Sequence, residues 1–317
     1  MPGEFDLIRD HFTRPARRAV LGVGDDCALL APHPGMQLAV SSDMLVEGRH
    51  FLSTVAPDRL GHKALAVNLS DLAACGAEPL AFTLALALPR ADPAFVGPFS
   101  NGLLALADAH DIELVGGDIT AGPLNICITV FGQVPPQQAL LRCGAHAGDD
   151  LWVSGRLGDA RLALEVFRGS LTLPGADFDA VRTAMEQPQP RVALGVALRG
   201  VASSAIDLSD GLLGDLQHVL NASGVGARVD VDALPRSPVV AALPLTLQHT
   251  CLLAGGDDYE LLFTAPVAHR DAVVAAGSAA GVAVTRCGSI EPGAGLHVVD
   301  RDGAPVTAAL RGFDHFD

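Results

Sequence analysis

Short acidic elements recur along this 317-residue chain where apolar segments end. They are Asp25–Asp26, Ser41–Ser42–Asp43, Asp71, Asp118, Asp207–Leu208–Ser209–Asp210 and Asp257–Asp258. One such element is explained by an ordinary turn, because Gly and Asp favour turns. Six on one chain, each flanked by Gly or apolar residues, instead predict a site for several Mg²⁺ ions, since carboxylate oxygens are the ligands that Mg²⁺ prefers.

A site of this kind suits phosphoryl transfer. Mg²⁺ usually binds through carboxylates together with substrate phosphates, and phosphoryl transfer depends mainly on positioning and charge neutralisation. The phosphate-binding pattern Gly-x-x-x-x-Gly-Lys-Ser/Thr is absent, as are protein-kinase signatures. A nucleotide would therefore be held through metal ions and a few donors, with Arg142 as a candidate. No Ser–His or Cys–His pair for covalent catalysis is evident.

Asp71 lies within the segment 64–76, which predicts a helix that is apolar nearly all round and therefore buried. A buried carboxylate is costly without a partner, and Lys63 lies two turns back. A bound cation would solve this problem. The alternative, an Asp that points into solvent, is the more economical explanation of a single such residue.

The other candidates also have simpler explanations. Ser41, Ser42 and Asp43 place three oxygen-bearing side chains inside an apolar strand. His50, which lies just beyond them, can be a structural histidine. An N-cap would explain one of Asp207, Ser209 and Asp210, but not all three before a helix at 211–222.

A further cluster is basic. Arg14, Arg17 and Arg18 end an expected helix at 4–18, and they indicate a solvated face rather than a site.

The elements that position these residues alternate between strand and helix, as in an α/β domain. The first half predicts helices at 4–18, 64–76 and 92–110 and strands at 37–46, 81–88, 113–120 and 125–131. The second half predicts helices at 159–168, 177–187, 190–201, 211–222 and 267–280 and strands at 150–154, before 207, before 264 and from 282. A linker at 133–138 predicts two domains, 1–136 and 137–317.

Composition narrows the class of partner. Hydrophobic residues make up 49% of the chain, and the formal net charge of −15 argues against nucleic acid as a partner. No apolar run approaches the length needed to span a membrane. The six cysteines are scattered, and the start of the chain is polar, so we expect a cytoplasmic protein.

Several motifs together resemble one family, thiamine-monophosphate kinase, and the resemblance runs from Gly3-Glu-Phe to the terminal Gly-Phe-Asp-His-Phe. The motifs are Gly22-Val-Gly-Asp-Asp-Cys-Ala-Leu-Leu, Ser41-Ser-Asp-Met-Leu-Val-Glu-Gly-Arg-His-Phe, Lys63-Ala-Leu-Ala-Val-Asn-Leu-Ser-Asp-Leu-Ala-Ala-Cys-Gly-Ala, Gly116-Gly-Asp-Ile-Thr, Ala205-Ile-Asp-Leu-Ser-Asp-Gly-Leu and Gly255-Gly-Asp-Asp-Tyr-Glu-Leu. The family belongs to the superfamily of aminoimidazole ribonucleotide synthetase and selenophosphate synthetase.

The resemblance implies an α/β (α+β) fold with two domains, the N-terminal one dimerising through its sheet. It implies a homodimer that uses ATP, several Mg²⁺ ions and thiamine phosphate. The activity implied is direct in-line transfer of the γ-phosphate of ATP to thiamine phosphate. The products would be ADP and thiamine diphosphate, as in the last step of thiamine diphosphate biosynthesis.

The resemblance also implies roles for individual residues. Ligands of Mg²⁺, direct or through water, would be Asp26, Ser41, Ser42, Asp43, Asp71, Asp118, Asp207 and Asp210, with Asp207 and Asp210 central to catalysis. Contacts to ATP would come from Gly117, Asp118, Arg142 and Ser209. Contacts to thiamine phosphate would come from His50, Asp257 and Phe313.

This chain departs from the family pattern at two positions. Asp257 stands where the family usually has Glu, and Ile119 stands where it often has Thr. One rival is a superfamily relative that activates an amide or selenide with ATP, but the ending Gly-Phe-Asp-His-Phe and the motif Gly-Gly-Asp-Asp-Tyr-Glu argue against it. A rival from another class is a non-catalytic regulatory protein that binds Mg-nucleotide.

Overall fold

The computed structural model describes residues 3–306. By internal contacts the chain forms two compact units. The first contains Met1–Leu72 and Ala77–Gln137, and the second contains Ala73–Gly76 and the chain from Gln138 onward. Each unit has its own sheet, so the expected α/β fold with two domains is confirmed. No helix among residues 3–306 has both the length and the apolar character needed to cross a membrane.

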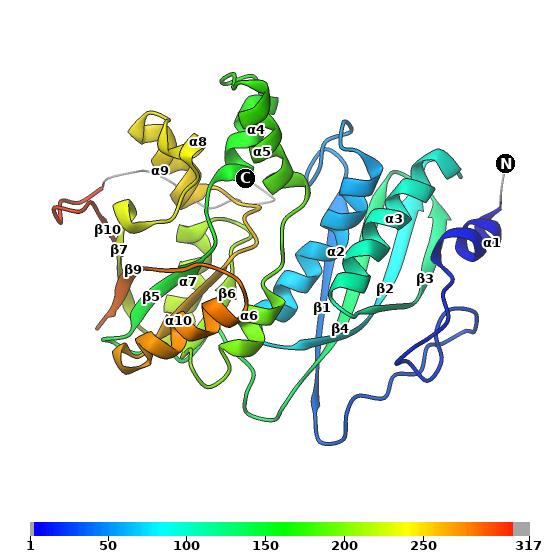
Figure 1. Cartoon of the computed structure of the whole chain (residues 1–317), viewed down its shortest axis with the longest axis horizontal. Helices are drawn as coiled ribbons and strands as arrows, with labels where there is room; N and C mark the ends of the chain where they lie inside the picture. The colour runs from blue at the N-terminus through cyan, green and yellow to red at the C-terminus, as the bar shows by residue number, and fades with distance from the viewer. Residues whose placement is uncertain (1–2, 307–317) are drawn as a thin grey trace. The chain divides into compact units, whose positions relative to one another are not determined.

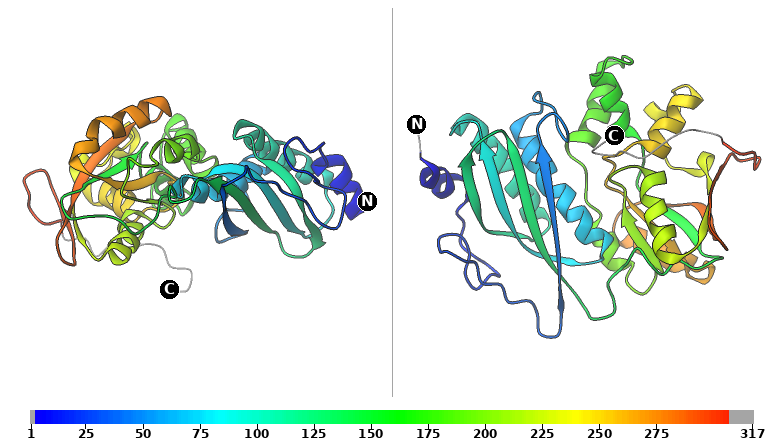
Figure 2. Two further views of the ribbon diagram at one scale, coloured as in Figure 1. Left: turned by 90° about the horizontal axis from the view of Figure 1, so that it is seen from below. Right: turned by 180° about the vertical axis from the view of Figure 1, so that it is seen from behind.

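The first unit is a four-stranded sheet covered by helices on one face (Figures 1 and 2). The strand order is β1-β4-β2-β3, with β2 and β3 parallel and the other neighbours antiparallel. The strands are β1 (Gln37–Val46), β2 (Glu78–Leu88), β3 (Glu113–Ala121) and β4 (Asn125–Val134). The helices are α1 (Glu4–Leu7), the π-helix η1 (Ile8–Phe12), α2 (Pro57–Ala74) and α3 (Pro93–Ala109).

The two faces of this sheet differ in burial. On β1, Leu45 is 4% exposed, whereas Leu38, Val40 and Met44 are 50%, 58% and 53% exposed. Successive side chains of a strand point to opposite faces, so the even-numbered residues of β1 line the face that the helices leave open. We call this the open face. Three large apolar side chains of β1 are therefore exposed together on this face.

The second unit is built on a six-stranded sheet of order β10-β7-β9-β5-β8-β6, with α6 and α10 on one face and α7 on the other (Figures 1 and 2). Its strands are β5 (Asp150–Ser154), β6 (Ser204–Asp207), β7 (Gly226–Asp230), β8 (Leu261–Ala265), β9 (Val284–Glu291) and β10 (Leu296–Val299). Its helices are α4 (Asp159–Phe167), α5 (Gly175–Glu186), α6 (Val192–Ala197), α7 (Leu212–Ser223), η2 (Val231–Ala233), α8 (Pro238–Ala241), α9 (Leu245–Ala254), η3 (Val267–His269) and α10 (Arg270–Ala279).

Several expected helices have other bounds than predicted. The helix expected over 64–76 is α2, which begins at Pro57 and ends at Ala74, and two others are shorter than predicted. The helix expected over 4–18 ends at Phe12, because Pro15 disfavours helical backbone at the residue before it, and Thr13 already has extended backbone. The helix expected over 190–201 is reduced to α6. β7, β10 and α9 were not predicted from the sequence, because the two strands are short and the apolar residues of α9 show no clear helical period.

Candidate functional site

In the first unit, the acidic residue of α2 meets the polar centre of β1. The hydroxyl of Ser41 donates a hydrogen bond of 2.5 Å to Asp71 Oδ2. The side-chain oxygen of Asn68, one turn earlier on α2, accepts the backbone N–H of Asp43 at 3.1 Å. Asn68 is 1% exposed, and the sequence analysis did not predict a role for it. These four residues form one group of oxygen donors that could receive a hard cation.

Ser42 does not join this group through its hydroxyl. Its side chain lies on the open face, where it donates to Ile128 O at 3.1 Å and lies 3.0 Å from Thr129 Oγ1. The strand alternation that brings Ser41 and Asp43 together therefore directs the hydroxyl of Ser42 away from Asp71.

Asp118 lies at the opposite edge of the same sheet. Its strand, β3, is separated from β1 by β2 and β4, so Asp118 is three strand spacings, roughly 14 Å, from β1. Asp118 pairs with Ala85, whose neighbours Leu84 and Leu86 are buried under the helices, so Asp118 is on the open face. Gly117 precedes it with a φ of 150°, and a Cβ there would meet Leu84 O at 1.9 Å.

The two remaining candidates of this unit belong to loops. Asp26 is exposed in a turn between Leu21 and Leu29, which form an isolated bridge. His50 follows β1, and its Nδ1 accepts the backbone N–H of Val46 at 3.0 Å, which leaves the proton of the neutral ring on Nε2. A cavity of about 520 Å³ opens beside it, walled by Phe51, Leu60, Phe95 and other side chains that include the acids Glu47 and Asp92.

In the second unit, two acidic turns lie side by side. Asp207 is the last residue of β6, the turn after it contains Ser209 and Asp210, and the turn before β8 contains Asp257. The backbone N–H of Asp257 donates to Ser209 O at 2.9 Å, and that of Tyr259 donates to Leu208 O at 2.8 Å. The structure therefore brings together two predicted catalytic and metal-binding residues, Asp207 and Asp210, with the predicted ATP contact Ser209 and the predicted thiamine phosphate contact Asp257.

The turn before β8 has an unusual backbone. Asp257 and Tyr259 both have positive φ, 67° and 50°, in the left-handed region that non-glycine residues rarely occupy. The hydroxyl of Tyr259 donates to Asp257 Oδ1 at 3.1 Å and so orients the carboxylate. Such backbone conformations persist where the surroundings hold them, and they are common in binding sites.

Asp215, on the first turn of α7, contacts the turn after β6 and was not predicted from the sequence. It is 3% exposed, and its Oδ2 accepts the backbone N–H groups of Asp210 and Gly211, both at 3.1 Å. Burial, with the nearby charge of Asp210, raises the pKa of Asp215 to about 7 against the opposing hydrogen bonds. The only sequence signal for this contact with the Asp210 backbone is the position of Asp215 on the first turn of α7, five residues after Asp210.

The other predicted residues are placed less completely. Arg142 is exposed, and its carbonyl accepts the hydroxyl of Ser223 at 3.3 Å. Phe313 lies outside the described residues. Within residues 3–306, no group of three or more His, Cys, Asp or Glu side chains is arranged to hold a metal ion. The site residues, and the roles assigned to them, remain predictions.

The comparisons with known proteins now define the class. Residues 24–134 match the family model of the AIR synthase related protein N-terminal domain, and residues 146–301 match that of the C-terminal domain. Thiamine-monophosphate kinase from Salmonella typhimurium is 45% identical, covering 99% of this chain and 98% of the relative. The enzyme from Escherichia coli K12 is 44% identical with the same coverage. The chain therefore belongs to the thiamine-monophosphate kinase family, which confirms the resemblance seen in its motifs.

Solved structures of the same family resemble this chain in fold. Thiamine-monophosphate kinase from Stenotrophomonas maltophilia K279a superposes with a TM-score of 0.85 at 46% identity, covering 91% of this chain and 92% of that one. A complex described as AaThiL with AMPPCP and TMP superposes with a TM-score of 0.78 at 29% identity, covering 90% and 89%. The hydrogenase maturation protein HypE of E. coli, at 22% identity and a TM-score of 0.78, shares the fold.

Proposed function

We propose that this protein is a thiamine-monophosphate kinase that transfers the γ-phosphate of ATP to thiamine phosphate, giving ADP and thiamine diphosphate. The observation that carries the proposal is the 45% identity to a thiamine-monophosphate kinase over 99% of this chain. The ligands named for the AaThiL complex, AMPPCP and TMP, are consistent with ATP and thiamine phosphate as the two substrates.

Several Mg²⁺ ions are part of the proposal. The oxygen donors fit this ion, because Asp71, Ser41 and Asp43 in the first unit and the acidic turns of the second supply hard ligands. When bound, Mg²⁺ would neutralise the charge of the two substrates and align their phosphates. The residues that would hold it are Asp26, Ser41, Ser42, Asp43, Asp71, Asp118, Asp207 and Asp210, with Ser42 limited to its main chain or to water.

The protein residues would act by positioning. Gly117, Asp118, Arg142 and Ser209 would hold ATP, and His50, Asp257 and Phe313 would hold thiamine phosphate. The attacking phosphate oxygen is already ionised at neutral pH, so the transfer needs no strong general base. Direct in-line attack on the γ-phosphorus, without a covalent enzyme intermediate, is the simplest mechanism consistent with these residues.

A homodimer through the open face also belongs to the proposal. Within one subunit Asp118 is three strand spacings from β1, and the open face that carries Asp118 and Ser42 is apolar and exposed. Pairing two copies across this face would cover Leu38, Val40 and Met44. It would also allow Asp118 of one copy to approach Ser42 on the open face of β1 of the other.

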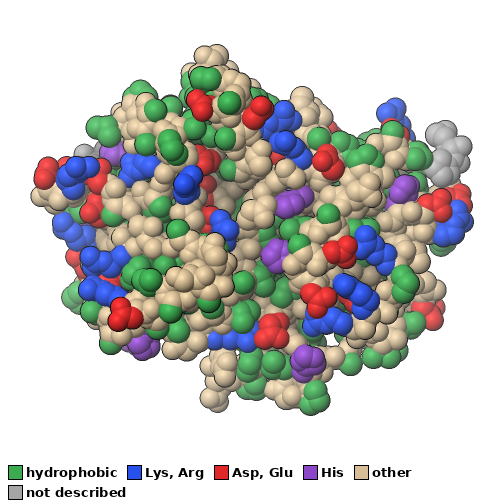
Figure 3. All heavy atoms as spheres, in the orientation of Figure 1, with side chains coloured by type: hydrophobic (Ala, Val, Ile, Leu, Met, Phe, Trp, Pro, Cys, Tyr) green, Lys and Arg blue, Asp and Glu red, His purple; other side chains and the backbone are tan. Residues whose placement is uncertain are grey.

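Partners of other classes are not part of the proposal. A net charge of −15 disfavours nucleic acid, and Figure 3 shows acidic and basic side chains interspersed over the visible face rather than a single basic patch. We expect a cytoplasmic enzyme that acts on small phosphorylated substrates.

An ADP-release assay tests this function. With Mg²⁺ and ATP, ADP should form when thiamine phosphate is added and not when it is omitted or replaced by unphosphorylated thiamine. Release that requires an amide or selenide acceptor would favour the other superfamily activities. Nucleotide binding without release under any of these conditions would favour a regulatory protein.

A further inference from the structure

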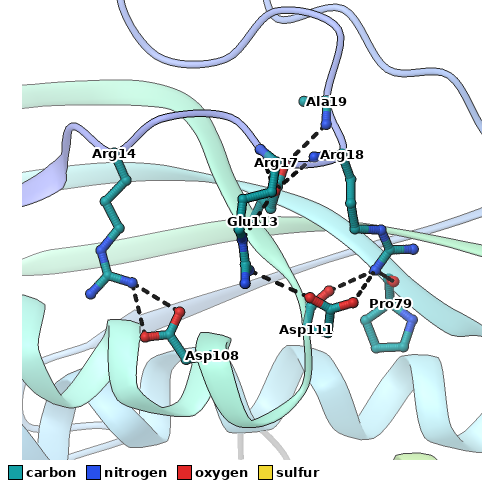
Figure 4. A network of polar contacts seen from close by, with 8 residues as sticks. All are labelled: Arg14, Arg17, Arg18, Ala19, Pro79, Asp108, Asp111 and Glu113. Atoms are coloured by element: carbon teal, nitrogen blue, oxygen red, sulfur yellow. Dashed lines mark hydrogen bonds and ion pairs between the residues drawn. The ribbon is translucent and has the colours of Figure 1, made fainter.

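A segment ahead of the Asp25–Asp26 turn is held by a single buried carboxylate. Glu113, at the start of β3, is 7% exposed. Its Oε1 accepts the backbone N–H groups of Arg17 at 2.7 Å and Arg18 at 2.9 Å, and its Oε2 accepts that of Ala19 at 3.0 Å. Figure 4 shows the three N–H groups converging on this side chain. We call this arrangement the Glu113 clamp.

The Glu113 carboxylate in the clamp is ionised. Burial by itself would raise the pKa of Glu113, but the hydrogen bonds from Ala19, Arg17 and Arg18 outweigh it and hold the pKa below its ordinary value. Hydrogen bonds to a charged acceptor are about twice as strong as those between neutral groups. Three of them to consecutive residues fix the backbone at 17–19 much more firmly than side-chain contacts alone.

The side chains around the clamp add exposed ion pairs. Arg18 reaches Asp111 at 3.0 Å, Arg17 reaches it at 3.5 Å, and Arg14 reaches Asp108 at 2.9 Å (Figure 4). Exposed pairs of this kind contribute little to stability. The basic cluster expected to be a solvated face is therefore part of a docking site for the N-terminal segment, and its backbone makes the principal contacts.

The Asp25–Asp26 turn follows directly from the clamped residues. Val20 N–H donates to Leu29 O at 2.8 Å, and Leu29 N–H donates to Leu21 O at 2.9 Å, which closes the base of the turn. Ala19, Ala28 and Leu30 pack on a small apolar cluster formed by Leu80, Ala81 and Val115. Asp26 itself is exposed, so its position is set through the base of the turn rather than by its own burial.

We propose that Glu113 is a positioning residue for Asp26, holding the turn where it can take part in binding Mg-nucleotide. The inference rests on the proposed function, which assigns Asp26 to the metal ions. Glu113 stands five residues before Asp118 on β3. The first residue of β3, Glu113, therefore fixes the segment that leads into the Asp25–Asp26 turn. A later residue of the same strand, Asp118, is a predicted nucleotide contact.

The clamp has a specific kinetic consequence. A turn that is no longer fixed must be ordered each time nucleotide binds, and this entropy cost lowers the affinity for nucleotide. Thiamine phosphate does not contact Asp26 in the proposed site, so its KM should change little. Loss of the clamp should therefore appear in the KM for Mg-ATP, while the KM for thiamine phosphate stays near the wild-type value.

Native-state proteolysis tests the clamp without using activity. Trypsin can cut the Arg17–Arg18 and Arg18–Ala19 bonds, whereas the Arg14–Pro15 bond resists it because proline follows. Cleavage at these two bonds should be faster than in the wild type in Glu113→Ala, and faster by a smaller factor in Glu113→Gln. The Gln side chain keeps one acceptor oxygen but turns an amide donor toward Ala19. Asp108→Asn, which removes only the exposed pair with Arg14, is the matched control and should be cut at the wild-type rate.

A double-mutant cycle tests the action through Asp26. Glu113→Gln should raise the KM for Mg-ATP about ten-fold, equivalent to 1.4 kcal/mol, in the wild-type background, and should have little further effect in Asp26→Asn. Equal effects in both backgrounds, or an equal rise in the KM for thiamine phosphate, would overturn the proposal. Unchanged cleavage in both Glu113 variants, shown folded by circular dichroism, would overturn it as well. If the wild-type protein makes no thiamine diphosphate, the proposed function fails instead, and the cleavage result still decides whether the clamp exists.

Discussion

At the scale of single residues, the pair of acidic turns in the second unit contains the position most open to test. Asp257 has a φ of 67° and accepts a hydrogen bond from Tyr259, so its carboxylate has a defined direction. The proposed function places it against thiamine, which carries a positive charge and an amino donor. A charge-assisted hydrogen bond of that kind contributes about 1.5–3 kcal/mol.

Asp257→Asn should therefore raise the KM for thiamine phosphate about ten-fold, since 1.4 kcal/mol corresponds to that factor. Asn tolerates left-handed backbone and can still accept from Tyr259, so this variant removes the charge without straining the turn. Initial-rate kinetics with each substrate varied in turn measure the effect. A rise in the KM for ATP alone would assign Asp257 to the nucleotide side of the site.

Prediction from sequence succeeds unevenly at this scale. The acidic residues at strand ends were recognisable because their Gly and apolar neighbours mark turns and buried segments. The orientation of Ser42, the distance of Asp118 from β1 and the contact of Asp215 with the Asp210 backbone were not. Each depends on strand order or on a helix turn against a loop, and these are non-local relations that residue types do not reveal.

At the scale of elements, the pairing of β2 with β3 depends on one glycine. A Cβ at position 117 would meet Leu84 O at 1.9 Å, and the φ of 150° is itself unfavourable for other residues. At the neighbouring Gly116, a Cβ would meet only Thr83 Cγ2, at 4.0 Å. The two glycines therefore differ sharply in what they tolerate.

Gly117→Ala should lower the free energy of unfolding by about 2 kcal/mol or more and abolish turnover, because β3 must shift to relieve the contact. Gly116→Ala, the matched control, should stay within about 0.5 kcal/mol of wild type. Urea unfolding followed by circular dichroism measures both. Equal stability of the two variants would show that the β2–β3 register is not restricted in this way.

A second element-scale prediction concerns the attachment of α10 to β5. Asp150 is 3% exposed and binds Arg270 Nε at 2.5 Å and Arg270 Nη2 at 2.9 Å, with Arg286 at 3.3 Å. The hydrogen bond from Arg270 is the main cause that holds the pKa of Asp150 below its usual value of 3.8. Because the folded-state pKa is depressed, this stabilisation is present above pH 3.8 and is lost as the pH falls through the folded-state value.

Asp150→Asn should therefore reduce the free energy of unfolding by about 1–2 kcal/mol at pH 7, and the difference from wild type should shrink below about pH 4. The estimate is modest because both arginines are about half exposed. Asp271→Asn, an exposed position on the same helix, should show no comparable pH-dependent difference. Urea titrations at several pH values check both variants.

Element boundaries were predicted less well than element types. The helix expected over 64–76, which corresponds to α2, and the longer strands of both sheets were recognisable from strong apolar patterns. The end of the first helix at Phe12 and the short α6 depend on local competition that periodicity does not capture. β7 and β10 form edge pairs of four or five residues, and their short patterns do not separate them from loops.

At the scale of the whole molecule, the open face of the first unit bears on assembly. Leu38, Val40 and Met44 are each at least half exposed on β1. Val40→Glu should convert the proposed dimer to a monomer, because a charge at the centre of an apolar interface is costly to bury. If the site needs both copies, the monomer should also lose activity.

Size-exclusion chromatography with light scattering measures the mass of each variant. Val274→Glu, at an exposed apolar position on α10, is the matched control and should leave the mass and the activity unchanged. A wild-type protein that is monomeric and active at assay concentration would contradict this part of the proposal.

The measurement that tests the central claim most directly is the fate of the γ-phosphate. The protein is incubated with Mg²⁺, thiamine phosphate and ATP labelled at the γ-phosphorus, and the products are separated and counted. The label should appear in the terminal phosphate of thiamine diphosphate, in equal amount to the ADP formed. Asp210→Asn, shown folded by circular dichroism, should form neither product. ADP without labelled thiamine diphosphate, or label released only as inorganic phosphate, would contradict phosphoryl transfer to thiamine phosphate.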